Sequence, residues 1–134
     1  MNDDPLYGRS ILLVEDHKQV ADMLEATLRE QGMAVEWAAD AEAALSAVDG
    51  HRFDLVLSDI VMTGPMNGLD LARRLKEENP DLLVVLMSGY PKDSVDGVAE
   101  FDFLPKPFEI SSLAAVIQKQ RSTSKSKHES STAA

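Results

Sequence analysis

The chain has 134 residues, 44% of them hydrophobic, and a formal net charge of −10. This length predicts one domain with its own core, and the absence of cysteine excludes disulfides and thiolate metal sites. The negative charge disfavours nonspecific nucleic-acid binding. No apolar run approaches the roughly 20 residues of a membrane span, and no secretory signal is visible. We therefore expect a cytoplasmic protein.

Apolar runs alternate with segments of helical periodicity along the first half of the chain. Residues 11–14 are a predicted strand, and the helical pattern after them ends at Gly32. A second strand is predicted at residues 34–38. The helix that follows it has Asp40 as its N-cap and ends at Gly50. These segments form two strand–helix units.

The second half repeats the pattern three more times. Residues 55–58 are a third predicted strand, followed by a loop rich in Gly and Pro and by a helix that ends near Asn79-Pro80. Residues 83–87 and 101–104 are the fourth and fifth strands. Only residues 91–100 are left for a fourth helix, which should therefore be shortened. The inner stripe of a last helix is formed by Ile110, Leu113, Val116 and Ile117.

Continuous apolar strands that alternate with amphipathic helices predict a parallel sheet covered on both faces. Five such units are typical of an α/β, flavodoxin-like (βα)5 three-layer sandwich with strand order 2-1-3-4-5. We expect this domain to occupy residues 10–121. Residues 1–9 would form an N-terminal extension. Residues 122–134 would form a disordered polar tail, because they have no apolar period.

Four of the predicted strands end beside polar or charged residues. Glu15-Asp16 follows the first strand, and Asp59 closes the third. Ser88 follows the fourth strand, and Lys106 lies between two prolines after the fifth. Because the carboxyl ends of parallel strands share one edge of the sheet, these side chains should converge. Three carboxylates, a hydroxyl and an ammonium suit a hard divalent cation and a phosphoryl group.

This ordered set resembles the receiver domain (CheY-like) of two-component response regulators, of the kind found alone or attached to hybrid histidine kinases. The resemblance covers roughly residues 10–121. It implies that Asp59 is the phosphoacceptor, an ionised carboxylate that forms an acyl phosphate. It also implies a Mg²⁺ site, which Mn²⁺ could occupy instead. Its ligands would be Asp16 and Asp59 directly, Glu15 through water, and the backbone carbonyl of Val61.

The same resemblance implies the residues that bind and sense the phosphoryl group. Ser88, Gly89 and Lys106 would surround it, with a cis peptide bond at Lys106-Pro107. Ser88 and Phe103 would move together on phosphorylation, as a two-state switch biased by a local charge change. An ordinary aromatic residue packed in the core is the open alternative for Phe103.

Two further positions should tune the rate of phosphoryl loss. Val61 and Tyr90, each the second residue after Asp59 or Ser88, flank the path of an attacking water in this family. Neither is a general base and both obstruct water, so we expect the acyl phosphate to last minutes or longer. His17 adjoins the acidic pair but is interpreted as a surface residue, since an imidazole is a poor Mg²⁺ ligand.

The chain departs from the family pattern in two places. Thr63 takes a position that is usually Pro, and the loop at residues 63–68 is one residue longer, as in receivers attached to hybrid kinases and in some stand-alone receivers. The shortened fourth helix weakens the surface on which receivers commonly form symmetric dimers. We therefore expect a monomer or a weak dimer.

The leading hypothesis is a phosphoacceptor module and not an enzyme. It would take a phosphoryl group from a histidine kinase or a histidine phosphotransfer protein and switch a protein-interaction surface, with no DNA-binding domain on this chain. An aspartate-nucleophile phosphohydrolase is the enzymatic alternative, but it would need an acid where Val61 stands. A phosphorylation-independent pseudo-receiver stays open. A flavin binder is disfavoured, because the loop after the first strand is acidic.

Overall fold

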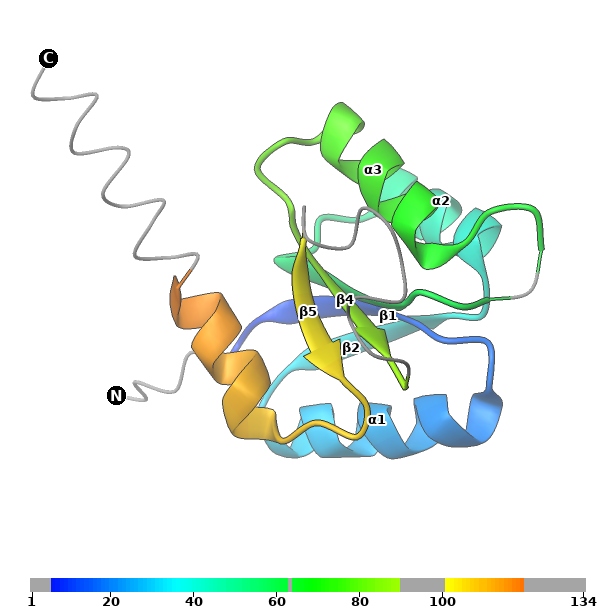
Figure 1. The fold of residues 1–134 in the computed structure, drawn as a ribbon. Helices are drawn as coiled ribbons and strands as arrows, with labels where there is room; N and C mark the ends of the chain where they lie inside the picture. The colour runs from blue at the N-terminus through cyan, green and yellow to red at the C-terminus, as the bar shows by residue number, and fades with distance from the viewer. Residues whose placement is uncertain (1–5, 63, 90–100, 120–134) are drawn as a thin grey trace, which may run out of the picture.

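The computed structural model describes residues 6–62, 64–89 and 101–119, which form a sheet flanked by helices (Figure 1). All strand pairings are parallel, and the order is β2-β1-β3-β4-β5. The predicted fold class and strand order are confirmed. The shortened fourth helix and the polar tail lie outside the described residues. The strands are β1 (Ser10–Val14), β2 (Ala34–Ala38), β3 (Leu55–Asp59), β4 (Leu83–Ser88) and β5 (Asp102–Pro105).

Helices cover both faces of the sheet. Two of them, α2 (Ala41–Gly50) and α3 (Gly68–Glu78), lie on one face. The other face carries α1 (Lys18–Glu30) and a last helix at residues 110–119. None of the described helices is both long and apolar enough to cross a membrane.

The starts of α2 and α3 follow from their capping residues. The Asp40 carboxylate accepts a hydrogen bond from the Ala43 amide at 2.8 Å, as the sequence predicts. Asn67 and Asp70 form a reciprocal capping box at the start of α3, with Asp70 N donating to Asn67 Oδ1 at 2.8 Å. These caps satisfy amides that have no partner within the helix. They therefore fix where each helix leaves the carboxyl edge of the sheet.

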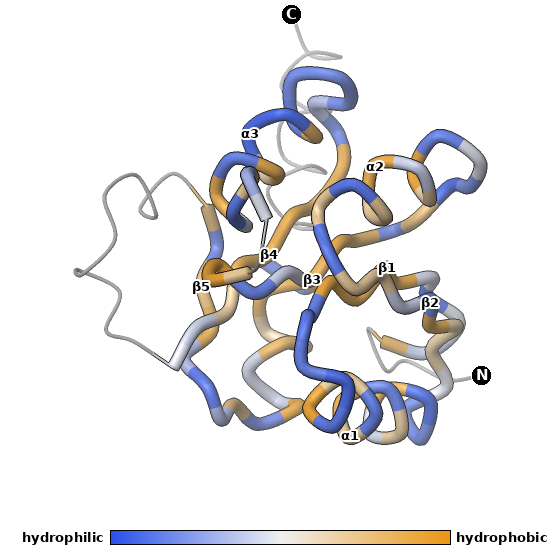
Figure 2. The backbone as a smooth tube through the Cα atoms, turned by 90° about the vertical axis from the view of Figure 1, so that its right-hand side faces the viewer, coloured by the Kyte–Doolittle hydropathy of each residue, from blue (hydrophilic) through white to orange (hydrophobic). Residues whose placement is uncertain are grey.

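The core has two halves, one on each face of the sheet, because side chains alternate along a strand. Leu12 and Val56 are register partners and pack under α2 and α3. Leu13 and Leu57, the next register pair, pack under α1 and the last helix. Figure 2 shows the central strands as hydrophobic and the helices as mixed in character. This burial on two faces explains why the central strands β1, β3 and β4 are largely apolar runs.

The segment before β1 packs against the domain. Leu6 is fully buried in the core half under α1. The Tyr7 ring lies so close to Gly32 that a Cβ there would come within 2.4 Å of it, and Gly32 has φ +87. Gly8 N donates to the Gly32 carbonyl at 3.0 Å. Residues 6–9 therefore pack against the domain, although the sequence predicts that the domain begins at residue 10.

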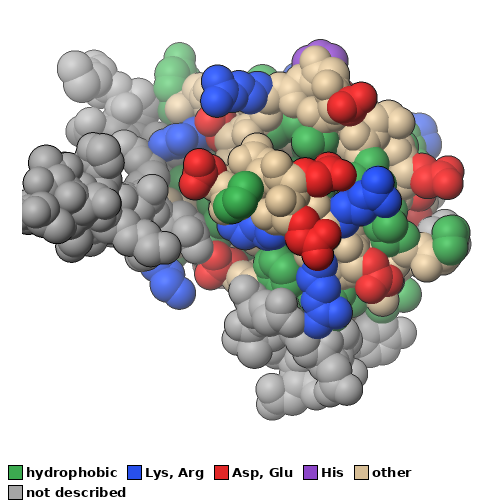
Figure 3. Space-filling model, turned by 90° about the horizontal axis from the view of Figure 1, so that it is seen from above, with side chains coloured by type: hydrophobic (Ala, Val, Ile, Leu, Met, Phe, Trp, Pro, Cys, Tyr) green, Lys and Arg blue, Asp and Glu red, His purple; other side chains and the backbone are tan. Residues whose placement is uncertain are grey.

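Charges of both signs are interspersed on the face seen from above in Figure 3. On α3, Arg74 and Glu78 form an ion pair at 3.5 Å with i,i+4 spacing. Such exposed pairs contribute little stability. Among the described residues on this face, the two signs of charge are therefore mixed and form no block of one sign.

Candidate functional site

The residues predicted for the site converge at the carboxyl edge of the sheet. Asp59 is the last residue of β3, and its register partner Met87 immediately precedes Ser88 on β4. Ser88 is in turn the register partner of Pro105, which immediately precedes Lys106. The Lys106 amide donates to the Ser88 carbonyl at 2.8 Å. The pairing of the strands therefore brings these groups together.

Lys106 joins two carboxylates, Glu15 just after β1 and Asp59 at the end of β3. Its Nζ donates to Glu15 Oε1 at 2.6 Å and to Asp59 Oδ2 at 3.0 Å. The Lys106-Pro107 peptide bond is cis, the geometry that the resemblance implies. Glu15 is fully buried and Asp59 is only 7% exposed. In such a setting an ammonium offsets much of the repulsion between carboxylates.

Burial and charge shift the pKa values of this pair. Burial is the main reason that the pKa of Glu15 is raised, and the nearby Asp59 carboxylate acts in the same direction, whereas Lys106 opposes both. Burial alone would lower the pKa of Lys106, but its hydrogen bonds to Glu15 and Asp59 outweigh this, and the pKa is raised. Lys106 is therefore a permanent cation of the site at physiological pH.

Glu15→Gln should stabilise the metal-free protein near neutral pH. Because the pKa of Glu15 is raised above its ordinary value of 4.5, the folded protein holds this proton more tightly than the unfolded chain does. The resulting stability is fully present below pH 4.5 and is lost as pH rises through the raised pKa. Gln does not ionise, so its gain in urea midpoint over wild type should appear near neutral pH and vanish near pH 4.5.

The measurement is urea unfolding in EDTA at both pH values. Glu30→Gln, at the exposed end of α1, is the matched control, and it should show no gain that depends on pH. A Glu15→Gln variant that is less stable than wild type near neutral pH would contradict the assignment of Glu15 as a buried anion whose charge lowers stability.

The acidic pair has the chemistry of a divalent-cation site. Ligand atoms of Glu15, Asp16 and His17 all lie within 4.8 Å of one another. Carboxylate oxygens are the ligands that Mg²⁺ prefers, so Glu15 and Asp16 fit this ion. His17 Nδ1 lies 3.1 Å from Asp16 Oδ1, but its side chain is 75% exposed. That exposure agrees with the interpretation of His17 as a surface residue.

Glu15 makes a direct contact with Lys106 that the sequence does not predict. The resemblance implies that it reaches the metal through water. In the structure its carboxylate binds Lys106 directly, and its Oε2 accepts the His17 amide at 3.4 Å. The indirect role in metal binding stays a prediction, and the direct contact with Lys106 is an addition to it.

The remaining predicted residues surround this cluster. The Ser88 side chain is buried, and a Cβ at Gly89 would meet nothing within 4 Å. Val61 is 53% exposed beside the acceptor strand. Phe103 is half-buried and packs against the core half under α2 and α3, so the switch and the ordinary core residue both stay open. Tyr90 lies outside the described residues.

Two further residues contact the site and were not predicted. A Cβ at Gly68 would come within 1.9 Å of the Asp59 carbonyl oxygen, so only glycine fits there. Trp37 Nε1 donates to the Glu15 carbonyl at 2.8 Å. The position of Gly68 directly after the capping residue Asn67 is a signal that could have been used. No local pattern points from Trp37 to the acidic pair, because 22 positions separate Trp37 from Glu15.

Comparison with known proteins gives relatives that share this fold. Sensor kinase CckA of Brucella abortus is 36% identical over 115 residues, which are 81% of this chain and 12% of that protein. The structure of NtrX from Brucella abortus in complex with ADP has a TM-score of 0.79 and 32% identity, over 92% of this chain and 29% of that one. The chain spans less than half the length of these curated relatives; for TctD of Salmonella typhimurium the share is 48%.

A smaller solved structure matches over almost its whole length. Response regulator TrrA from Thermotoga maritima, in complex with Mg²⁺-BeF, has a TM-score of 0.75 and 26% identity, over 84% of this chain and 98% of that one. TrrA has also been solved in complex with histidine kinase ThkA. The sequence model of the response regulator receiver domain matches residues 11–118. This chain therefore belongs to the response regulator receiver domain family.

Proposed function

We propose that Asp59 accepts a phosphoryl group from the phosphohistidine of a histidine kinase or a histidine phosphotransfer protein. The observation that carries this proposal is the position of Lys106 Nζ, 3.0 Å from Asp59 Oδ2 and 2.6 Å from Glu15 Oε1. A cation at this point balances the negative charge of the carboxylate and places a donor where phosphoryl oxygens would arrive. The complex of TrrA with ThkA supports a kinase as partner.

The transfer requires only positioning and charge stabilisation from this chain. A carboxylate oxygen of Asp59 attacks phosphorus and forms a P–O bond. The P–N bond to the donor imidazole breaks, and its electron pair stays on the imidazole nitrogen. Lys106 donates to an equatorial phosphoryl oxygen, and the Ser88 hydroxyl lies at the end of the neighbouring strand, where it can donate to another.

Mg²⁺ is the metal that this oxygen-rich site fits best, and Mn²⁺ prefers the same ligands. We propose Asp16, Asp59 and the Val61 carbonyl as direct ligands and Glu15 as a ligand through water. When bound, the ion neutralises charge that develops on the transferring phosphoryl oxygens. The Mg²⁺-BeF complex of TrrA supports this choice.

The phosphorylated protein is proposed to act as a signal, and the phosphoryl group is not released rapidly as a reaction product. Val61 stands where an aspartate-nucleophile phosphohydrolase would carry its second acid, so turnover should be at most slow. Phosphorylation would draw Ser88 toward the phosphoryl group and let Phe103 turn inward, which changes a surface that partners bind. We infer a cytoplasmic module that acts as a monomer or a weak dimer.

The test is incubation with Mg²⁺ and a small phosphodonor, followed by intact-mass measurement. Wild type should gain one phosphoryl group and, once freed of donor, keep it for minutes. Lys106→Ala should be phosphorylated at least roughly tenfold more slowly, because it loses a donor to the transferring group. Lys76→Ala, which removes a half-buried lysine of α3 whose ammonium donates to the Pro80 carbonyl at 3.1 Å, should behave as wild type.

Two results would contradict the proposal. One is a wild-type protein that takes up no phosphoryl group under these conditions, which would favour a pseudo-receiver. The other is a Lys106→Ala variant that reacts at the wild-type rate. Continuous release of inorganic phosphate over many turnovers would instead favour the phosphohydrolase.

A further inference from the structure

Trp37 contacts the metal-binding loop from the edge of the sheet. It is the only tryptophan of the chain, it lies on the edge strand β2, and it is 36% exposed. Its indole Nε1 donates to the Glu15 carbonyl at 2.8 Å. The next residue, Ala38, accepts a hydrogen bond from the Glu15 amide at 3.1 Å through its own carbonyl. The end of β2 thus holds both backbone polar groups of Glu15.

The hydrogen bond to the Glu15 carbonyl also constrains Asp16. That carbonyl and the Asp16 amide belong to one planar peptide group. A hydrogen bond to the carbonyl oxygen therefore fixes the orientation of the whole peptide plane that leads into Asp16. The Glu15 side chain is held separately, by Lys106 at 2.6 Å and by the His17 amide at 3.4 Å. The direction in which the Asp16 carboxylate leaves the loop therefore depends on the peptide plane that Trp37 holds.

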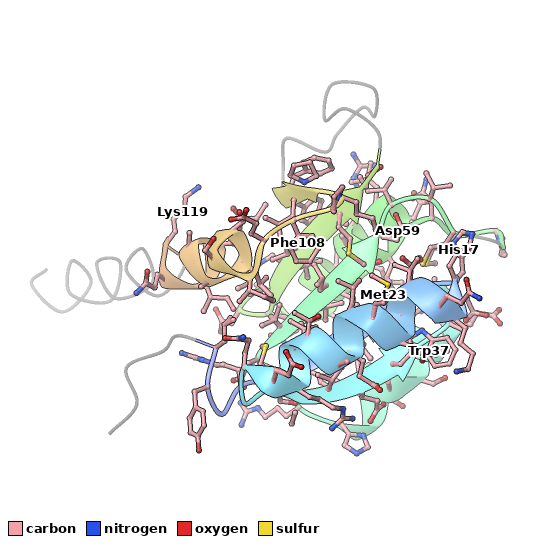
Figure 4. The ribbon with its side chains drawn as sticks, turned by 90° about the horizontal axis from the view of Figure 1, so that it is seen from below. His17, Met23, Trp37, Asp59, Phe108 and Lys119 are labelled. Carbon is pink, nitrogen blue, oxygen red and sulfur yellow. The ribbon has the colours of Figure 1, made fainter. Side chains whose placement is uncertain are left out.

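We propose that Trp37 is a positioning residue for the metal site, which orients the Asp16 carboxylate toward a bound divalent cation through the Glu15–Asp16 peptide. The inference rests on the proposed magnesium site and extends it to a residue on a strand that carries none of the proposed ligands. Figure 4 shows Trp37 and His17 near the amino-terminal end of α1. The Lys18 ammonium, 6.0 Å from the centroid of the indole ring, adds a contact that keeps the ring in place.

A simpler role for Trp37 makes a different prediction. Aromatic residues are favoured in strands for packing alone, and in that role Trp37 would stabilise β2 without affecting the metal. Loss of the ring would then lower stability but leave metal affinity unchanged. Trp37→Phe separates the two roles, since it keeps an aromatic ring and removes the N–H donor.

The experiment is calorimetric titration of the whole chain with Mg²⁺. Trp37→Phe should raise the Kd for Mg²⁺ by roughly three- to tenfold, the loss expected when one hydrogen bond is removed. At saturating Mg²⁺ its rate of phosphorylation should return to that of wild type, because the reacting groups are intact. Met23→Ala, a control on the exposed side of α1 where Met23 is 71% exposed, should change neither quantity.

A second measurement does not depend on any variant. The fluorescence of Trp37 in wild type should change on Mg²⁺ addition, with the Kd found by calorimetry. Two results would overturn the inference and leave the proposed magnesium site intact. One is an unchanged Mg²⁺ affinity in a folded Trp37→Phe variant. The other is a Trp37 fluorescence that does not change on Mg²⁺ addition although calorimetry detects binding. Absence of Mg²⁺ binding by wild type would overturn the proposed magnesium site itself.

Discussion

Asp59→Asn should abolish phosphorylation while leaving the fold intact. The side-chain amide has nearly the shape of the carboxylate but carries no anionic oxygen to attack phosphorus. The 2.6 Å hydrogen bond from Lys106 to Glu15 does not involve Asp59, so the ammonium should still have a carboxylate partner in the variant. Incubation with a small phosphodonor and Mg²⁺, followed by intact-mass measurement, should show a phosphoryl group on wild type and none on Asp59→Asn.

Asp54→Asn is the matched control for this loss. Asp54 lies just before β3, at the opposite end of that strand from Asp59. It accepts a hydrogen bond from the Ser10 amide at 2.7 Å and is exposed. This variant should be phosphorylated as wild type is. Residual phosphorylation of Asp59→Asn at a wild-type rate would mean that another side chain is the acceptor.

Gly68→Ala should destabilise the protein strongly, although it adds only one methyl group. The added Cβ would come within 1.9 Å of the Asp59 carbonyl oxygen and within 2.8 Å of Ile60 Cα. Both are backbone atoms of the acceptor strand and its exit, so neither yields as a flexible side chain would. We expect a loss of roughly 3 kcal/mol in the free energy of unfolding, the upper end of the usual range for overpacking.

The same change should also slow phosphorylation, because relief of the clash moves the backbone that carries the acceptor. Urea unfolding measures the first effect, and the intact-mass assay measures the second. Gly50→Ala is the control, since a Cβ there meets nothing within 4 Å, and it should be neutral or mildly stabilising. Full stability and normal phosphorylation of Gly68→Ala would show that α3 does not hold the acceptor strand as closely as inferred.

Much of the fold could be predicted from local pattern. The central strands β1, β3 and β4 are largely apolar because both of their faces are buried, and the sequence shows this as a change from helical periodicity to short apolar runs. Asp40 marks the start of α2 because its carboxylate satisfies the Ala43 amide. The polar residues at the strand ends were expected to converge because parallel strands bring their carboxyl ends to one edge. Each of these inferences needs only neighbours in sequence or a general rule of topology.

The contacts that shape the site could not be predicted in the same way. The hydrogen bond between Lys106 and Glu15 spans 91 positions, and the one between Trp37 and Glu15 spans 22. The close approach of Gly68 to Asp59 depends on where the loop after β3 returns to the sheet. Local periodicity holds no information on such distances. A family resemblance supplies the roles of a motif, but not the contacts of residues outside it.

The position of the phosphoryl group tests the central claim most directly. Wild type would be incubated with a phosphodonor, with Mg²⁺ or with EDTA, and then reduced with borohydride, which converts an aspartyl phosphate to homoserine. Peptide mass spectrometry should find homoserine at position 59 only, and only in the sample with Mg²⁺. A phosphoryl group on Ser88 or on a histidine, or equal labelling of Asp59 in EDTA, would contradict the claim that Asp59 accepts phosphorus in a magnesium-dependent site.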